Sequence, residues 1–366
     1  KYDTWDGELY LETHQGTLTT QARTKRNNRK MEIMLRELEY ASMLANINTP
    51  YDYPQEVIEK IWKEVLLYQF HDILPGSSIK RVYDESEERF NVLDEETKAL
   101  TNKAYRAVAD KIDLDDTKTP YIIFNSLSWQ RDEWLCVEGA WHYVSVPAMG
   151  YTVVDQDNTK LDQSYLSTSE NVLENDRVKV SFASDGSIKS IYDKDNDREI
   201  IPEGMTGNHL SVYEDDGDAW DFSITYDQKV PGVFELKSRK AYLDGPRAVL
   251  EQVYRYGQSE VVQNIVVTQG SSRIDLETQV DWKERNKMLR TSIPVDVHTS
   301  EAVCDIQFGT IKRPCHRNTS WDAAKYEVCA HKWVDLSQRD YGLALLNDCK
   351  YGYKVLDNTI DLNLLR

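Results

Sequence analysis

The spacing of apolar residues in this chain changes close to Pro120. Before that position they recur every three or four residues, as on one face of a helix, and after it they alternate with polar residues, as in a β-strand. Because one segment cannot satisfy both periods, the two parts must fold as different kinds of structure. A chain of 366 residues is also too long for one ordinary core. We therefore predict an α+β multidomain protein, helical first and β-structured afterwards.

Three helical patterns precede the change, in residues 33–44, 57–73 and 82–112. The connections between them are short, so the helices are expected to pack as an antiparallel three-helix bundle over about residues 25–112. Threonines in the turn at residues 16–20 are expected to cap the first helix. Residues 1–118 are thus predicted to form a helical domain whose apolar stripes are its core.

Short alternating segments follow Pro120, with turns and no helical pattern between them. Asp185-Gly186 separates two of the segments and is a strong hairpin signal. The pattern predicts a small β segment or linker sandwich over residues 119–170 and a large antiparallel β-sandwich over residues 171–366, incomplete at its end. The segments are residues 121–124, 141–147, 177–182, 188–193, 249–256, 261–267 and 274–281.

Charge and cysteine content limit the partners and the compartment. The chain has 62 Asp and Glu against 44 Lys and Arg, a net charge of −18, and this average field would repel a nucleic acid. No apolar run is long enough to predict a membrane span, and the first residues do not form a signal peptide. Five widely spaced cysteines indicate reduced thiols in the cytoplasm. The chain begins in the middle of a sequence pattern and ends without a stop signal, so we expect it to be a piece of a longer protein.

A histidine and an aspartate, His71 and Asp72, stand where the second helical pattern meets Pro75-Gly76. Pro-Gly stops a helix, so both side chains are expected in its last turn, pointing past the helix end. There an imidazole can bind a metal, and a carboxylate can accept hydrogen bonds from a polyhydroxylated ligand. A favourable charge against the helix dipole is the plainer explanation of a single histidine, because the multi-ligand spacing of a zinc motif is missing.

Several separate motifs in the chain resemble the α-mannosidases of glycoside hydrolase family 38, in its bacterial and cytosolic branch. Upstream, the resemblance rests on residues 7–22, on Lys25-x-x-Asn28-Arg29 and on Gln-Phe-His-Asp-Ile-Leu-Pro-Gly-Ser-Ser at 69–78. It covers nearly the whole chain, as the middle helical domain and C-terminal β-sandwich region of such an enzyme. The downstream motifs are residues 124–129, 281–284, 309–314, 318–322, 331–337 and 347–353.

This resemblance implies a retaining α-mannosidase that acts on mannose-containing oligosaccharides and holds a divalent metal, usually zinc, with cobalt as another candidate. His71 matches the family's histidine ligand from this region, and Asp72 matches a carboxylate that binds the same sugar. The family's nucleophile and acid/base lie in an N-terminal catalytic α/β barrel, and no such pattern precedes Lys1. We therefore expect this chain to lack catalytic residues and to be inactive alone. The resemblance also implies a mutarotase-like supersandwich as the β region.

Three further features bear on the sugar site. His14 is a second substrate-binding candidate because it stands beside the best-matched turn, although a surface histidine is the plain alternative. Tyr68 stands where the family commonly has Asn. Residues 215–221 are only reminiscent of the family's Asp-Ala-Trp-Asp segment, so Trp220 and Asp221 receive no role here.

Two rival interpretations concern the β region. Cys315 and His316, with His331, suggest a second metal site, but adjacent residues of a strand point to opposite faces and do not easily share one ion. A non-catalytic carbohydrate-binding or docking module is the alternative function, since a sandwich with many Trp and Tyr can stack sugar rings. Only the enzyme requires a barrel with a His-x-Asp motif upstream.

Overall fold

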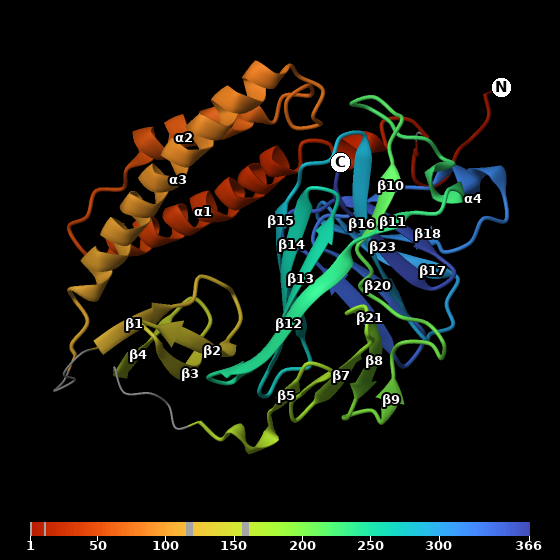
Figure 1. Cartoon of the computed structure of the whole chain (residues 1–366). Helices are drawn as coiled ribbons and strands as arrows, with labels where there is room; N and C mark the ends of the chain where they lie inside the picture. Colours follow the sequence, from red (N-terminus) through yellow and green to blue (C-terminus); the bar gives the residue numbers. More distant parts are fainter. Residues whose placement is uncertain (1, 11, 115–119, 156–160) are drawn as a thin grey trace.

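The computed structural model describes residues 2–10, 12–114, 120–155 and 161–366. Three long helices occupy the N-terminal part: α1 (Ala22–Asn48), α2 (Gln55–Tyr68) and α3 (Lys80–Ala109). They lie next to one another along one side of the molecule (Figure 1). Their facing sides share one apolar core, made of Met31, Leu35, Leu38, Ile58, Ile61, Val65, Phe90 and Leu93. The predicted helical N-terminal part is confirmed.

The helix ends differ from the predictions. Gln21, at the N-cap of α1, has a φ of 57° and makes no side-chain cap. The hydroxyl of Thr20 instead donates to the carbonyl of Gly16 at 2.8 Å, inside the preceding turn. The capping prediction was therefore wrong, because the threonine stabilises the turn and not the helix. On α2, Leu66 is 55% exposed although its position in the apolar pattern predicted burial.

Antiparallel β-structure follows the helices, as predicted. All the strand pairs described are antiparallel. Two small sheets, β1 (Pro120–Phe124) with β4 (Tyr151–Asp155) and β2 (Arg131–Val137) with β3 (Ala140–Val146), lie near the helices (Figure 1). The predicted boundary between residues 118 and 119 falls in residues 115–119, outside the described part of the chain.

Four larger sheets form the rest of the molecule. In spatial order, one contains β5 (Ser167–Ser169), β6 (Val172–Glu174), β7 (Val178–Phe182), β8 (Ile188–Asp193) and β9 (Arg198–Glu199). The second contains β12 (Glu235–Asp244), β13 (Arg247–Tyr256), β14 (Ser259–Thr268) and β15 (Ile274–Asp281). The third contains β11 (Gly232–Val233), β10 (Ser211–Glu214), β16 (Lys287–Pro294), β23 (Thr359–Leu365), β22 (Gly352–Leu356) and β19 (Val328–Cys329). The fourth contains β18 (Gly309–Pro314), β17 (Glu301–Ile306), β20 (Trp333–Ser337) and β21 (Gly342–Leu346).

Local sequence explains the best-predicted hairpin, between β7 and β8. Gly186 has a φ of +89°, a backbone conformation that is strained for any residue with a side chain. A Cβ there would also lie 2.3 Å from the hydroxyl of Tyr254. Asp185 accepts a hydrogen bond from the Ser187 amide at 3.0 Å. A single apolar core joins residues from all four larger sheets. Beyond residue 120, the described α-helix is the short α4 (Ser320–Ala324), which agrees with the predicted β region.

A buried ion network crosses the third sheet. Arg290 on β16 has no exposed side-chain surface and pairs with Glu327 at 2.8 Å and with Asp361 on β23. Burial opposes the charge of Arg290, but Asp361 and Glu327 together hold its pKa well above the usual value. The network therefore joins β16, β23 and the segment before β19 through charges that water does not reach.

Candidate functional site

The residues after α2 form a separate turn that carries His71 and Asp72. The helix ends at Tyr68, and the amide of Gln69 donates to the carbonyl of Leu66, three residues back. The amide of Ile73 then donates to the carbonyl of Phe70 at 2.8 Å and starts a new turn. The expectation that both side chains lie in the last turn of the helix was wrong, because these short-range bonds close the helix before Pro75 is reached. We call residues 69–76 the His71 turn.

The side chains of His71 and Asp72 lie together at the surface. The Nε2 atom of His71 is 3.3 Å from Oδ2 of Asp72, and the side chains are 75% and 42% exposed. The imidazole packs on Phe70 with ring centroids 4.2 Å apart, and the Ser77 hydroxyl donates to Oδ1 of Asp72 at 3.2 Å. An accessible imidazole nitrogen beside a carboxylate is a donor set that zinc accepts, and free carboxylate lone pairs can bind hydroxyls.

The beginning of α3 supports the His71 turn. The hydroxyl of Ser78 donates to the backbone carbonyl of Asp72 at 2.7 Å. The hydroxyl of Tyr83 donates to the same carbonyl at 3.2 Å and accepts a hydrogen bond from the Ser78 amide at 2.9 Å. Asp72 is therefore held through its backbone as well as by the contact of Ser77 with its Oδ1 atom, while its side chain remains 42% exposed.

His14 lies beside a second turn, residues 14–20, which we call the His14 turn. Its imidazole is exposed and lies 4.9 Å from the Trp220 ring, centroid to centroid, at an angle of 47°. The Asp221 carboxylate accepts a hydrogen bond from the Gln15 amide at 2.8 Å. The carbonyl of Trp220 accepts one from the Thr17 amide at 3.2 Å. Sequence reasoning missed both partners, although their similarity to the Asp-Ala-Trp-Asp segment was the available signal.

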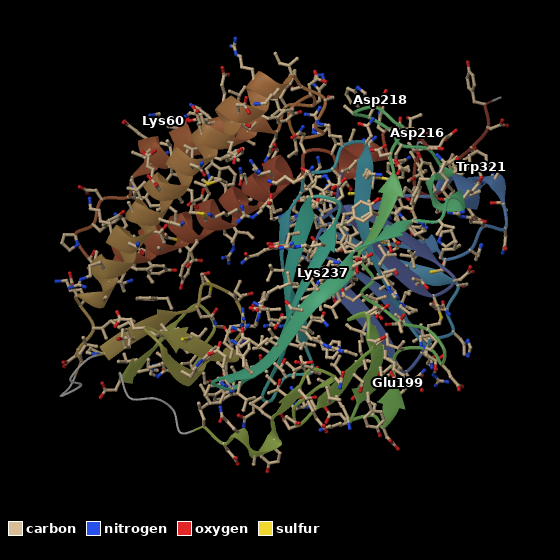
Figure 2. The ribbon with its side chains drawn as sticks, viewed as in Figure 1. Lys60, Glu199, Asp216, Asp218, Lys237 and Trp321 are labelled. Atoms are coloured by element: carbon tan, nitrogen blue, oxygen red, sulfur yellow. The ribbon has the colours of Figure 1, made fainter. Side chains whose placement is uncertain are left out.

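An acidic loop, residues 215–221, carries these partners. Arg366, only 3% exposed at its side chain, pairs with Asp215 at 2.7 Å and donates to the hydroxyl of Thr20 at 2.8 Å. Figure 2 shows Asp216 and Asp218 on this loop, which follows β10. The loop is thus joined to the His14 turn through one buried guanidinium.

The His14 and His71 turns are in contact. Gly76 has a φ of +104°, and a Cβ there would lie 2.6 Å from Cγ2 of Thr20. Lys25, buried in α1, donates to the carbonyls of Thr20 at 2.6 Å and Leu74 at 2.8 Å. The structure therefore brings together two turns whose separate motifs the sequence could only place along the chain.

His331 contacts helix α1, away from Cys315. Its Nδ1 is 3.4 Å from Nη2 of Arg29 on α1, and Nε of Arg29 donates to the Tyr351 hydroxyl at 3.2 Å. His316 pairs instead with Asp322 at 3.4 Å, and Cys315 is buried. Within the described residues, no group of three or more His, Cys, Asp or Glu could hold a metal ion.

This contact between α1 and the β region should weaken in mild acid. Burial, and then the charge of Arg29, lower the pKa of His331 below 6.5, so the folded state binds fewer protons than the unfolded state. Stability should therefore fall as the pH drops below about 6.5. Thermal melts between pH 7.5 and 5.5 measure this, and His331→Gln should flatten the dependence. An unchanged slope in that variant would contradict the assignment.

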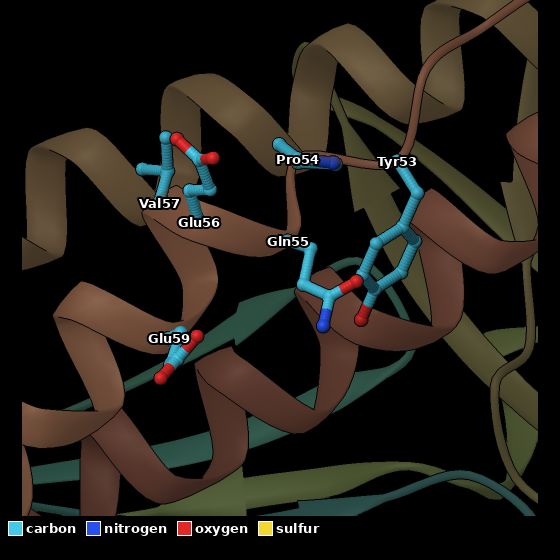
Figure 3. A pocket seen from close by; sticks show the side chains of 6 residues that line it. All are labelled: Tyr53, Pro54, Gln55, Glu56, Val57 and Glu59. Atoms are coloured by element: carbon cyan, nitrogen blue, oxygen red, sulfur yellow. The ribbon is translucent and has the colours of Figure 1, made fainter.

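One surface pocket lies far from both turns. Figure 3 shows it at the start of α2, lined by Tyr53, Pro54, Gln55, Glu56, Val57 and Glu59. The nine residues of α2 that follow Glu59 separate the pocket from the His71 turn by roughly 14 Å at 1.5 Å per residue. It is therefore not part of the candidate site. Among the described residues, no helix combines the length and the apolar character needed to cross a membrane.

Two family models match the chain. Residues 173–366 match the C-terminal domain of glycosyl hydrolases family 38, and residues 12–108 match the α-mannosidase middle domain. In fold, the chain is similar to the crystal structure of an α-mannosidase from Enterococcus faecalis V583, with a TM-score of 0.82 at 16% identity. That similarity covers 96% of this chain and 52% of the other.

Curated relatives are similar in sequence over the whole chain. α-Mannosidase G from Dictyostelium discoideum is 32% identical over 100% of this chain, and human α-mannosidase 2C1 is 34% identical over 99%. The chain spans only 40% and 36% of the length of these two proteins. Since the matches reach from the His14 turn to the last strand, the chain belongs to glycosyl hydrolase family 38, with its middle and C-terminal domains.

Proposed function

We propose that this chain is part of a retaining, metal-dependent α-mannosidase that hydrolyses terminal α-mannosides of oligosaccharides. The observation that supports it most is the contact between the His14 and His71 turns, which carry the chain's three candidate ligand-binding side chains. Family membership supplies the reaction class. Asp72 and His14 would bind the sugar, and His71 would bind the metal.

The residues of this chain would supply only part of a metal site. His71 offers an accessible imidazole nitrogen beside a carboxylate, and such groups bind zinc, with cobalt as a second candidate. Catalytic zinc sites use about three protein ligands, so the others must come from elsewhere. When bound, such a metal acts as a Lewis acid and orients the substrate's hydroxyls. This chain's part is to hold one imidazole and one carboxylate in place.

The reacting carboxylates would come from an N-terminal catalytic α/β barrel of the same protein. Retaining hydrolysis needs two carboxyl groups about 5–5.5 Å apart, one as nucleophile and one as acid/base. Exposed apolar side chains beside His71 support a missing partner domain: Leu66, Leu67, Phe70 and Ile79 are between 49% and 70% exposed. The surface around the His71 turn would then pack on the barrel.

The finer architecture belongs to the same proposal. We infer an antiparallel three-helix bundle in a domain of residues 1–118, a small β unit over 119–170 and a mutarotase-like supersandwich over 171–366. The shared helical core and the core common to the four larger sheets support it. Five free cysteines, three of them buried, support a cytoplasmic location.

Separating the chain from its partner domain tests the function. The 366-residue chain should fold yet remain inactive on aryl α-mannosides, with or without added zinc or cobalt, because it would lack the two reacting carboxylates. The whole protein should release mannose with retained configuration, which NMR of the first product anomer measures. Turnover that follows the isolated chain through purification would show that a nucleophile lies within it.

A non-catalytic sugar-binding module is the second candidate. Trp5 and Trp321 are 52% and 66% exposed, with ring centroids 5.0 Å apart, and exposed indoles can stack on sugar rings. Figure 2 places Trp321 on α4, at the edge of the β region. If the whole protein binds mannan but cleaves no mannoside, this module replaces the enzyme as its function.

A further inference from the structure

Lys25 is a buried cation with an unusual set of partners. Lys25 is only 5% exposed, and its ammonium group donates to the carbonyls of Thr20, Leu74 and Pro75 at 2.6, 2.8 and 3.4 Å. Within the described residues, no ion pair involves it. Burial lowers the pKa of Lys25 to about 7, so its position in the fold is costly for a charge.

The hydrogen-bond acceptors of the Lys25 ammonium group are backbone carbonyls. In the turns and loops of the described residues, no backbone amide donates to the carbonyls of Thr20, Leu74 or Pro75. These carbonyls lie at half-buried residues, where a lost donor is only partly replaced by water, so the Lys25 ammonium stabilises both turns at once. An apolar side chain of similar length would fill the same space but would donate to none of the three.

The same face of α1 also holds the start of the His71 turn. Gln69 donates through Nε2 to Oδ1 of Asn28 at 3.0 Å and to Oε1 of Glu32 at 3.2 Å. Lys25, Asn28 and Glu32 are spaced i, i+3 and i+7, so they share one side of the helix. His71 and Asp72 therefore lie between two attachments to a single helix face, one before them and one after them.

We propose that Lys25 is a positioning residue of the site: with Asn28 and Glu32 it holds the His71 turn at both ends and fixes it against the His14 turn. This inference rests on the proposed function and adds to it the residues that set the distance between the metal-binding and sugar-binding groups. Lys25 touches neither ligand. It acts through Leu74 and Thr20, whose carbonyls it joins.

The test compares Lys25→Met with Val180→Ala in the whole protein. Val180 lies in β7, fully buried in the β core, and its truncation lowers stability without touching either turn. At temperatures where both variants are folded, Lys25→Met should raise KM for an aryl α-mannoside about 10-fold and lower bound zinc, as changes behind a metal ligand do. Val180→Ala should leave both unchanged.

Hydrogen exchange separates positioning from general stability. Backbone amides of residues 70–74, 76 and 77 should exchange faster in Lys25→Met and not in Val180→Ala. If Lys25→Met does not fold, Asn28→Ala, which removes one of the two acceptors of Gln69, should speed exchange at the start of the turn. Wild-type KM, zinc content and exchange in the folded Lys25 variant would overturn the proposal. If the wild-type protein itself cleaves no mannoside, the proposed function is wrong. Hydrogen exchange in the variants would still show whether Lys25 holds the His71 turn on α1.

Discussion

His71→Ala in the whole protein is expected to lower metal content and α-mannosidase activity together, by roughly 100-fold or more. The reason is that His71 would be one of few metal ligands, and changing residues that only support ligands already costs about 10–100-fold. The side chain is 75% exposed, so its removal should leave the fold intact. Metal analysis of the purified variant and kinetics on an aryl α-mannoside measure the two effects.

Two further variants serve as a control and a comparison for His71→Ala. His298→Ala removes another exposed histidine, from the β region, and should change neither quantity. Asp72→Asn keeps the shape of a side chain that accepts from Ser77, but it loses the charge that strengthens hydrogen bonds to sugar hydroxyls. It should keep most of the metal and weaken mannose binding. An active, metal-replete His71→Ala enzyme would show that His71 is not a ligand.

Glu327→Gln should destabilise the β region by about 3–5 kcal/mol, because it leaves the charge of Arg290 partly uncompensated inside the protein. Both side chains have no exposed surface, so water cannot take the place of the missing carboxylate. At about 2–4 °C per kcal/mol, the melting temperature should fall by roughly 10 °C. Differential scanning calorimetry of the 366-residue chain measures the shift.

An exposed ion pair provides the matched control. Arg81 and Glu85 on α3 pair at 2.8 Å, but their side chains are 79% and 59% exposed, and solvent screens such pairs. Glu85→Gln should therefore leave the melting temperature almost unchanged. A fall of similar size in both variants, or in neither, would mean that burial does not govern the strength of the Arg290 network.

Much of the fold could be predicted because local spacing decides it. The helices and most of the predicted strands follow from apolar periods of 3.6 and 2, and the Asp185-Gly186 hairpin follows from turn chemistry. The errors lie at helix ends. Thr20 and Phe70 fit a cap and a helical stripe in sequence, but the turns beside α1 and α2 use them differently.

By itself, the sequence determined the three long helices, seven of the described strands and their order along the chain, and it singled out His71, Asp72 and His14 as the residues to examine. Only the tertiary structure decided what surrounds them: Lys25 reaches Leu74 across 49 residues, and Gln15 reaches Asp221 across 206. Apolar periods act within an element and carry no information on which distant turns meet. That meeting depends on how the helices and sheets pack, because only packing repays the entropy of closing such long loops.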